Sequence, residues 1–437
     1  SRFRHWYDYA GTPQIEVRGE YDEVERCYRL HMKQWVPDTP GQSDKPPFHI
    51  PVRVGLLDSK GREMKLLRQG AADPALLELR EAEQTFVFRE LDEAPVPSLL
   101  RGFSAPVRLH FDYSDADLHF LMSHDSDGFN RWDAAQTLAQ RMIIRMVEQG
   151  ADPVVVPDDY LQTFLDVLEK SDQDPALAAE ILLLPSESWL GDQMEEVDVE
   201  GIHRVREGIK AGVGKRLEDE LLQHYRRLND LGEYRIDPDS MGRRSLKNLL
   251  LEYLMAAGGS MAHALCLAQY NEAANMTDVI AALSYIAHSH LPEREAILAD
   301  FAERWKDDPL VMDKWFSVQA VSRREDTLPG IQVLLSHPAF SMENPNKVRS
   351  LIGAFAAGNP LRFHAPDGSG YTFLVDKVLE LDGINPQIAA RLLRNLSRWR
   401  RLDAKRQELV RFQLERVLRQ PDLSRDLHEV AAKLLEA

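Results

Sequence analysis

The sequence predicts a multidomain protein in which a small Ig-like β-sandwich is followed by a large all-α, solenoid-like (superhelical) domain. The chain has 437 residues, and a single hydrophobic core stops growing at about 250 to 300 residues. Short segments rich in β-branched and aromatic residues occupy residues 14–122, whereas helix signals follow one another from His124 to the end. We therefore expect a terminal helix within residues 1–13, the sandwich domain over 14–122 and the helical domain over 123–437.

The first segment, residues 1–10, has the pattern of a short helix. It ends at Gly11-Thr12-Pro13, where glycine permits a left-handed C-cap and proline prevents the helix from continuing. The chain begins with Ser1 and lacks the apolar stretch and small-residue cleavage site of a signal peptide. We expect this end to be a cut made inside a longer chain.

Six segments of the sandwich region show the alternation, or the β-branched and aromatic enrichment, that is typical of strands. Turn residues separate them: "DSKG" (58–61) ends a hairpin loop with glycine, and Pro95 and Pro97 exclude a central strand in "APVPS". This many short strands in so short a region favours a sandwich. The segments are "QIEVR" (14–18), "RCYRLHM" (26–32), "HIPVRVGLL" (49–57), "QTFVF" (84–88), "PVRLHFDY" (106–113) and "LHFLM" (118–122).

The rest of the chain predicts many short helices. Asn130 with Asp133 favours a capping box that begins a helix reaching about Glu148. Later helices are expected wherever Asp or Asn precedes Pro, because the Asx side chain caps free N–H groups and proline at the first helical position needs no donor. The array is expected to be curved, with a concave working side. These starts are Asp174-Pro175, Asp308-Pro309, Asn344-Pro345 and Asn385-Pro386.

Composition excludes several classes of function. The net charge of −17 argues against general binding to nucleic acid or anionic membranes. The longest apolar runs, such as 248–259, are shorter than the roughly 18 to 20 residues that span a bilayer, so we expect no membrane span. Cys27 and Cys266 fall in different predicted domains, which argues against a disulfide framework and favours a reducing cytoplasm.

A basic segment, residues 391–419, stands out in this acidic chain, with ten Lys or Arg against three acids. Charge runs are most often solvated helix faces. The alternative is that part of the segment faces the concave side, where cations would attract peptide carboxylates and hold them by charge-assisted hydrogen bonds. Arg391 belongs to this segment, and Arg349, on the helix begun by Asn344-Pro345, is a candidate for the same space.

The sequence contains no complete catalytic or metal-binding motif. A gluzincin-type zinc peptidase needs H-E-x-x-H, but His428-Glu429 lacks the second histidine and is expected on the surface of the terminal helix. "GVGKRL" (212–217) lacks the first glycine and the Ser/Thr of a phosphate-binding loop, and "DSDG" (125–128) lacks the glutamate of a calcium loop. We expect "DSDG" to be a hinge between the two domains. The sequence therefore gives no catalytic and no metal-ligating residues.

The whole chain resembles the C-terminal half of bacterial aminopeptidase N, the zinc-dependent alanyl aminopeptidase of the gluzincin clan. Many ungapped blocks in the right order carry the resemblance, and any one of them alone would be weak. Those blocks include "FRHWYDYAGTP", "FNRWDAAQ", "DPALAAEIL", "NEAANMTD", "LVMDKWF", "NPNKVRSLIGAFAAGNP", "DGSGY" and "NPQIAAR".

The resemblance implies missing N-terminal and catalytic domains, with residues 1–13 as the end of the catalytic domain. It implies that zinc and all catalytic groups lie outside this chain, and that the helical domain caps the active site, forms a chamber and restricts which peptides enter. Arg349 and Arg391 match positions that look toward that chamber. The implied parent is a monomer acting on peptide substrates, and this chain alone should be inactive.

Another class of function remains open. An Ig-like domain joined to an α-solenoid is also the architecture of a stand-alone protein-interaction module, since solenoids bind partners on extended concave surfaces. A hydrolase with an unfamiliar site receives little support, because no nucleophile, base and orienting group cluster in the sequence.

Overall fold

The computed structural model describes residues 2–229 and 234–436, and Ser1, where the expected terminal helix begins, lies outside them. The chain forms two compact units. The first contains residues 1–141 and 157–184, and the second contains 142–156 and 185–437.

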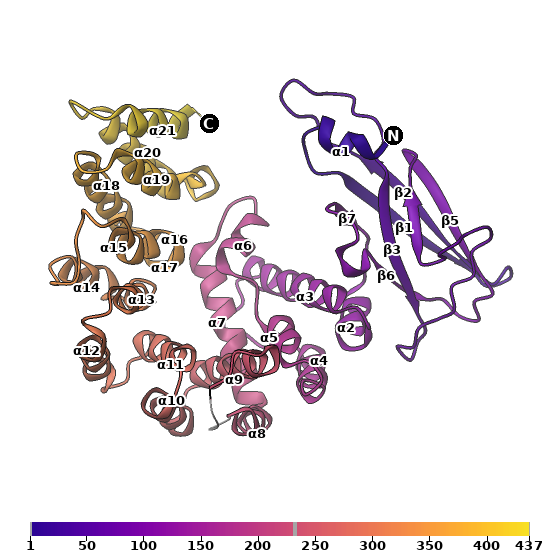
Figure 1. The fold of residues 1–437 in the computed structure, drawn as a ribbon, viewed down its shortest axis with the longest axis horizontal. Helices are drawn as coiled ribbons and strands as arrows, with labels where there is room; N and C mark the ends of the chain where they lie inside the picture. Colours follow the sequence, from indigo (N-terminus) through magenta and orange to yellow (C-terminus); the bar gives the residue numbers. More distant parts are fainter. Residues whose placement is uncertain (1, 230–233, 437) are drawn as a thin grey trace. The chain divides into compact units, whose positions relative to one another are not determined.

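The first unit is built on a sandwich of two sheets, which confirms the predicted Ig-like fold (Figure 1). One sheet has the strand order β5-β2-β1-β7, in which β1 pairs antiparallel with β2 and parallel with β7. The other sheet has the order β4-β3-β6. The strands are β1 (Gln14–Asp22), β2 (Cys27–Trp35), β3 (Ile50–Leu57), β4 (Leu76–Leu79), β5 (Glu83–Arg89), β6 (Val96–Leu99) and β7 (Arg108–His110).

The sandwich core follows from the alternation along its strands. Inward positions such as Leu30 on β2, Val52 on β3 and Phe88 on β5 are fully buried, while the residues between them face outward. The sequence missed β4 and β6, which have four residues each. Pro97 lies in β6, an edge strand of its sheet, so the exclusion of a central strand there was correct.

The N-terminal helix expected over residues 1–10 is present as a 3-10 turn, Arg2–Arg4, and a short helix α1, His5–Asp8. Trp6 fastens it to the sandwich, because the indole Nε1–H donates to the carbonyl oxygen of His49 at 3.0 Å. The Trp6 ring also lies edge-on to Phe48, with 5.2 Å between ring centroids.

The strand predicted at 118–122 is wrong, because these residues lie in helix α2 (Asp115–His124). Ser114 and Asp117 form a reciprocal capping box that starts this helix, and that local signal outweighs the weak alternation of "LHFLM". The next helix, α3 (Gly128–Glu148), begins two residues before the predicted Asn130. Its first free N–H groups are met by Asp127, whose Oδ1 accepts from the Asn130 backbone at 3.0 Å.

The segment "DSDG" (125–128) is not a hinge between domains, because it is a tight connection between α2 and α3 inside the first unit. The Asp125 carboxylate is buried and pairs with Arg101, with 2.9 Å between Oδ1 and Nη2. Burial raises the pKa of Asp125. Asn130 donates to the Ser98 hydroxyl at 2.6 Å and holds the start of α3 against β6. Two further helices, α4 (Asp158–Glu169) and α5 (Pro175–Leu182), complete this unit.

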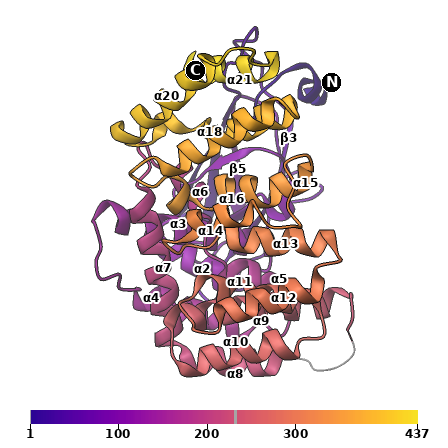
Figure 2. The ribbon, with the colours of Figure 1, turned by 90° about the vertical axis from the view of Figure 1, so that its left-hand side faces the viewer.

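The second unit is a curved array of helices in two layers, which confirms the predicted solenoid-like domain (Figures 1 and 2). Figure 1 shows α9, α11, α13, α15 to α17 and α19 on the inner side, with α8, α10, α12, α14, α18 and α20 behind them. The array consists of α6 (Glu187–Asp192), α7 (Val199–Arg216), α8 (Glu218–Leu228), α9 (Pro238–Ala257), α10 (Ser260–Glu272), α11 (Met276–His288), α12 (Arg294–Trp305), α13 (Pro309–Ala320), α14 (Thr327–Leu334), α15 (Pro345–Val348), α16 (Ala354–Gly358), α17 (Pro360–Phe363), α18 (Ser369–Asp382), α19 (Pro386–Leu393), α20 (Ala404–Leu418) and α21 (Arg425–Glu436).

Inner helices of the array repeatedly begin with Asp or Asn followed by proline. All four starts predicted from the sequence are confirmed, including the one at α5. The same device also starts α9, at Asp237-Pro238, and α17, at Asn359-Pro360. In each case the Asx side chain accepts a hydrogen bond from a backbone N–H of the first turn, so the helix start is fixed to a particular residue.

Helix α7 braces the array from within. It packs along α9 and also contacts α17. Ion pairs tie it to later parts of the chain: Glu200 pairs with Arg406, and Glu207 Oε1 lies 2.6 Å from Arg323 Nη1. These contacts join segments more than a hundred residues apart in sequence, so they restrain the curvature of the array.

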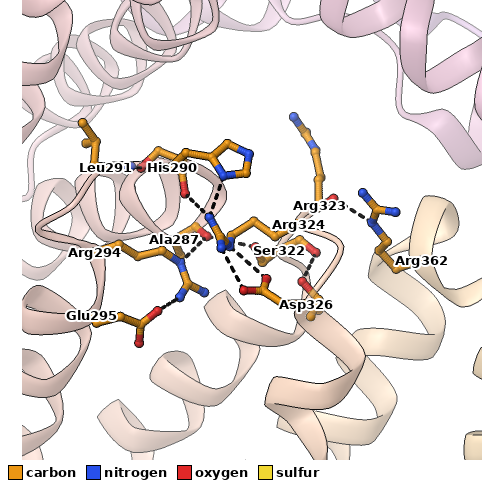
Figure 3. A network of polar contacts seen from close by, with 12 residues as sticks. Ala287, His290, Leu291, Arg294, Glu295, Ser322, Arg323, Arg324, Asp326 and Arg362 are labelled. Carbon is orange, nitrogen blue, oxygen red and sulfur yellow. Dashed lines mark hydrogen bonds and ion pairs between the residues drawn. The ribbon is translucent and has the colours of Figure 1, made fainter.

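The loop after α13 is locked to its neighbours by side chains that donate to backbone carbonyls (Figure 3). Arg324 donates to the carbonyl of Ser289 at 3.1 Å through Nη1 and pairs with both carboxylate oxygens of Asp326 through Nε and Nη2. Ser322 donates to the carbonyl of Ala287 at 2.9 Å, and Arg362 donates to the carbonyl of Arg323 at 2.7 Å. The ends of α11, α13 and α17 are therefore held together.

A buried ion pair joins α9 to α11. Lys247 Nζ lies 2.6 Å from Asp278 Oδ2, and both side chains are at most 5% exposed. Asn248 donates to the other carboxylate oxygen at 3.0 Å. Since each charge is desolvated, each depends on the other for compensation.

We predict that Asp278→Asn destabilises the second unit by about 3 to 5 kcal/mol, because it leaves the Lys247 ammonium buried without its counter-charge. Urea unfolding, read together with hydrogen exchange of α9 and α11, measures this loss. The control is Glu429→Gln, which breaks the exposed Lys433–Glu429 pair and should change stability by no more than about 0.5 kcal/mol. Equal effects of the two substitutions would contradict the account.

Candidate peptide-binding groove

The inner side of the second unit carries a groove of about 1070 Å³ that contains both arginines singled out from the sequence. Its walls come from α13, from the continuous helical stretch 345–358 and from α19. The floor is mainly apolar. The larger apolar side chains that line it include Ile280, Leu310, Val318, Val348, Ile388 and Leu392.

Three exposed cations line this groove: Lys314 on α13, Arg349 on the 345–358 stretch and Arg391 on α19. Arg349 donates to the side-chain oxygen of Asn346. Within the described ranges, 2–229 and 234–436, neither Lys314 nor Arg391 has an ion pair or a side-chain hydrogen bond. The structure thus brings Arg349 and Arg391 together and leaves their charges available to a ligand.

Lys314 was missed by the sequence analysis, although a signal for it exists. Arg391 lies six residues after Asn385, the cap of α19, and Lys314 lies six residues after Asp308, the cap of α13. Arg349 lies five residues after Asn344. Because the caps fix where these inner helices begin, cations at similar offsets fall at similar heights on neighbouring helices. We call Lys314, Arg349 and Arg391 the cationic ladder.

Arg349 opens a π-helical turn, Arg349–Gly353, between α15 and α16. A π turn inserts one extra residue into a helix and is found frequently at functional sites. Here Val348, Leu351 and Ile352 around the turn are fully buried, so the inserted residue shifts the helix surface without exposing the core. Arg349 remains exposed at the groove.

A second layer of charge fixes the groove wall. Lys347 is 5% exposed and donates to the carbonyl of Pro309 at 2.7 Å. Its Nζ also lies 2.8 Å from Asp313 Oδ1. Asp313 is the one carboxylate among the described residues that line the groove, and Lys347 already compensates it. The groove therefore presents net positive charge over an apolar floor.

The sequence left two interpretations of the basic segment 391–419 open, a solvated helix face and a cationic wall of the concave side. Different residues of the segment fit different interpretations. Arg391 faces the groove, as the functional interpretation requires. Other members have acidic partners and serve the fold: Arg406 pairs with Glu200 and Asp403, and Arg416 pairs with Asp376. Arg398 pairs with Asp192 at 2.7 Å. Only part of the segment is therefore available for binding.

Two stretches that partly match functional motifs, residues 212–217 and 428–429, lie on ordinary helices. "GVGKRL" (212–217) covers the end of α7 and its C-cap Leu217, so it forms no phosphate-binding loop. His428 and Glu429 lie exposed on α21, as expected. No helix among the described residues combines the length and the apolar character needed to cross a membrane.

Two groups of side chains within the described ranges have ligand-type atoms close enough together for a metal ion, and neither suits zinc. In the first, Asp22, Glu25 and Cys27, Arg29 already pairs with both carboxylates. Burial also raises the pKa of the Cys27 thiol. A metal ion would have to displace Arg29 from both carboxylates.

The second group is Glu187, His203 and Glu207. His203 Nδ1 lies 2.8 Å from Glu187 Oε1 and so is already bonded. Glu207 Oε1 lies 2.6 Å from Lys210 Nζ and 2.6 Å from Arg323 Nη1. A metal ion would compete with these fixed cations for the same oxygens, so the group is an internal charge network.

Comparison with known proteins agrees with the fold. Residues 115–436 match the family described as "Domain of unknown function (DUF3458_C) ARM repeats", and residues 11–112 match "Domain of unknown function (DUF3458) Ig-like fold". The chain is therefore an Ig-like domain joined to an ARM-repeat helical domain. It belongs to the DUF3458_C family, whose model matches residues 115–436.

The chain is 42% identical over 437 residues to Aminopeptidase N of Escherichia coli and 38% identical over 438 residues to Aminopeptidase N of Haemophilus influenzae. These matches cover 100% of the chain and 50% of each relative, so the chain spans about half the length of the curated relatives it matches. The resemblance to the C-terminal half of bacterial aminopeptidase N is confirmed.

A solved structure has the same fold. The crystal structure of Legionella pneumophila aminopeptidase A in complex with aspartic acid superimposes with a TM-score of 0.85 at 29% identity. The match covers 100% of this chain and 50% of that one. Both units of the chain therefore have counterparts within one aminopeptidase chain.

Proposed function

We propose that this chain acts as the non-catalytic C-terminal portion of a zinc metallo-aminopeptidase that removes N-terminal residues from peptides. The observation that carries the proposal is the full-length match to half of each aminopeptidase relative. In this proposal zinc and the hydrolytic groups belong to the catalytic domain, and the chain contributes binding surface and shape. The parent works as a cytoplasmic monomer, and the buried free thiols of Cys27 and Cys266 suit a reducing compartment.

The groove gives this portion a chemical task. A peptide substrate that places its N-terminus at a catalytic zinc still has a free C-terminal carboxylate at its other end. The cationic ladder offers charge-assisted hydrogen bonds to such a carboxylate, and the apolar floor accepts the side chains before it. The helical domain then caps the active site, forms the wall of a chamber and restricts access to peptides short enough to fit.

The ladder also suits peptides of different length. Its three cations lie on α13, on the 345–358 stretch and on α19, so carboxylates at different distances from the catalytic centre can each meet one of them. Lys and Arg act differently here, because arginine holds a carboxylate through two parallel N–H groups whereas lysine acts as a point charge. We therefore propose that Arg349 and Arg391 bind the peptide carboxylate more tightly than Lys314 does.

We predict that the isolated 437-residue chain hydrolyses no aminoacyl amide, with or without added zinc, and that mixing it with the separately produced catalytic half restores activity. Release of a chromogenic amine from alanyl substrates measures both results. Turnover that scales with the purified chain alone and survives removal of trace proteases would overturn the non-catalytic assignment. If the intact parent is active but the two halves do not associate, the result would contradict the proposal that the parent consists of a catalytic half and a separate binding half.

We predict that Arg349→Gln with Arg391→Gln in the intact parent lowers kcat/KM about tenfold or more for peptides long enough to reach the groove, because a charge-assisted hydrogen bond contributes roughly 1.5 to 3 kcal/mol. Dipeptides should be hydrolysed as before. Steady-state kinetics over a series of peptide lengths measures this dependence.

The matched control is Arg411→Gln, which removes an exposed cation of α20 that does not line the groove and should change no substrate. C-terminally amidated peptides provide a second control, since they should lose the same advantage without any mutation. Equal losses for dipeptides and long peptides would show that the arginines support the fold and do not bind the carboxylate.

A further inference from the structure

A second, smaller cavity lies beside the groove in the same unit. It has a volume of about 260 Å³ and is enclosed by α6, by the start of α7, by the stretch 356–364 and by residues 394–402. Ala357 and Asn395 line both hollows. The proposed aminopeptidase role does not use this cavity.

The interior of the cavity is apolar and already formed. Val199, Ile202, Leu396 and Trp399 are among its lining residues, and each is at most 6% exposed. A cavity of about 150 Å³ with apolar walls is enough to bind benzene, whereas drug-sized ligands need about 300 Å³ or more. The size therefore fits a molecule with an apolar body of four to six carbon atoms, by the same scale.

Hydrogen bonds hold the cavity wall in place. Arg401 donates to the carbonyl of Asp192 at 3.2 Å and also to that of Met194. The backbone N–H of Val197 donates back to the carbonyl of Arg401 at 2.7 Å. Trp399 is fixed as well, because its indole N–H donates to the carbonyl of Leu434 at 2.9 Å. A ligand would enter a preformed space without ordering these groups.

The charged lining favours an anion. Three arginines, 394, 398 and 401, line the cavity against two acids, Glu187 and Asp192. Both acids already have partners: Glu187 forms a hydrogen bond with His203, and Asp192 forms an ion pair with Arg398 at 2.7 Å. Arg394 is exposed and has no hydrogen bond or ion pair with any residue that the structure describes.

The charge states of Glu187 and His364, which also line the cavity, are compatible with an anionic ligand. Burial alone would raise the pKa of Glu187, but the hydrogen bond from His203 and the nearby cations outweigh burial and lower this pKa. The Glu187 carboxylate therefore stays charged and paired with His203. Burial, with help from Arg406, lowers the pKa of His364 to about 4, so this histidine is neutral near pH 7. The net charge of the lining is therefore positive.

We propose that this cavity is a binding site for a small apolar carboxylate, with the apolar body between Ile202, Leu396 and Trp399 and the carboxylate held by Arg394. A phosphate or other purely polar anion would leave the apolar interior unfilled. A neutral apolar molecule would make no charge-assisted hydrogen bond with Arg394. An apolar carboxylate satisfies both parts of the site at once.

The test uses the 437-residue chain with 4-methylpentanoate and its neutral isostere 4-methylpentanamide, and titration calorimetry measures the affinities. We expect the carboxylate to bind at least tenfold more tightly than the amide, and Arg394→Gln to weaken carboxylate binding about tenfold. The control Arg411→Gln makes the same change in net charge away from the cavity and should leave the affinity unchanged.

A second variant, Ala356→Leu, places extra carbon atoms in the cavity lining and should abolish binding of both compounds. If this buried substitution disturbs the fold, circular dichroism reveals it and the Arg394→Gln comparison decides alone. Equal affinities for acid and amide, no saturable binding of the acid, or equal losses for Arg394→Gln and Arg411→Gln would each overturn the proposal.

Discussion

The second unit depends on one local constraint, the Asx–Pro start of its inner helices. In α9, α13, α15, α17 and α19 an Asp or Asn side chain accepts a backbone N–H of the first turn while proline occupies the first helical position. The device satisfies one orphan donor and removes another. Because it fixes the residue at which each helix begins, it also fixes the height at which every later side chain faces the concave surface.

The rest of the array follows from that fixed geometry. Inner helices with set starts stack so that their ends meet, and side chains such as Arg324 and Ser322 join those ends through backbone carbonyls. Helix α7 then ties distant parts of the array together, through Glu207 and Glu200. Charged side chains inside the unit, such as Glu200, Glu207 and Arg406, form pairs of this kind. The cationic ladder differs, because its charges face a solvent-accessible groove, and we propose it as a binding surface for this reason.

Much of the fold could be predicted from the sequence, because the signals were local. Alternation gave the longer strands, and the Asx–Pro dipeptides gave helix starts. Strands β4 and β6, with four residues each, are too short for alternation to register. At 118–122 the strand prediction failed because the capping box at Ser114 lies outside the "LHFLM" window that suggested it. Of the site, Arg349 and Arg391 were found from the motifs around them. Lys314 was missed although its offset from the Asp308 cap is a local signal. The convergence of the three cations and the cavity beside Arg394 depend on contacts between residues far apart in sequence.

The account rests on the claim that the cationic ladder meets the C-terminal carboxylate of a peptide whose N-terminus lies at the catalytic centre. The most direct measurement is an experimental structure of the intact parent with a non-hydrolysable peptide of five or six residues. The account predicts the peptide carboxylate within hydrogen-bond distance of Arg349 or Arg391, with Lys314 nearby. A peptide ordered along its whole length, with its carboxylate held elsewhere and the groove empty, would contradict it.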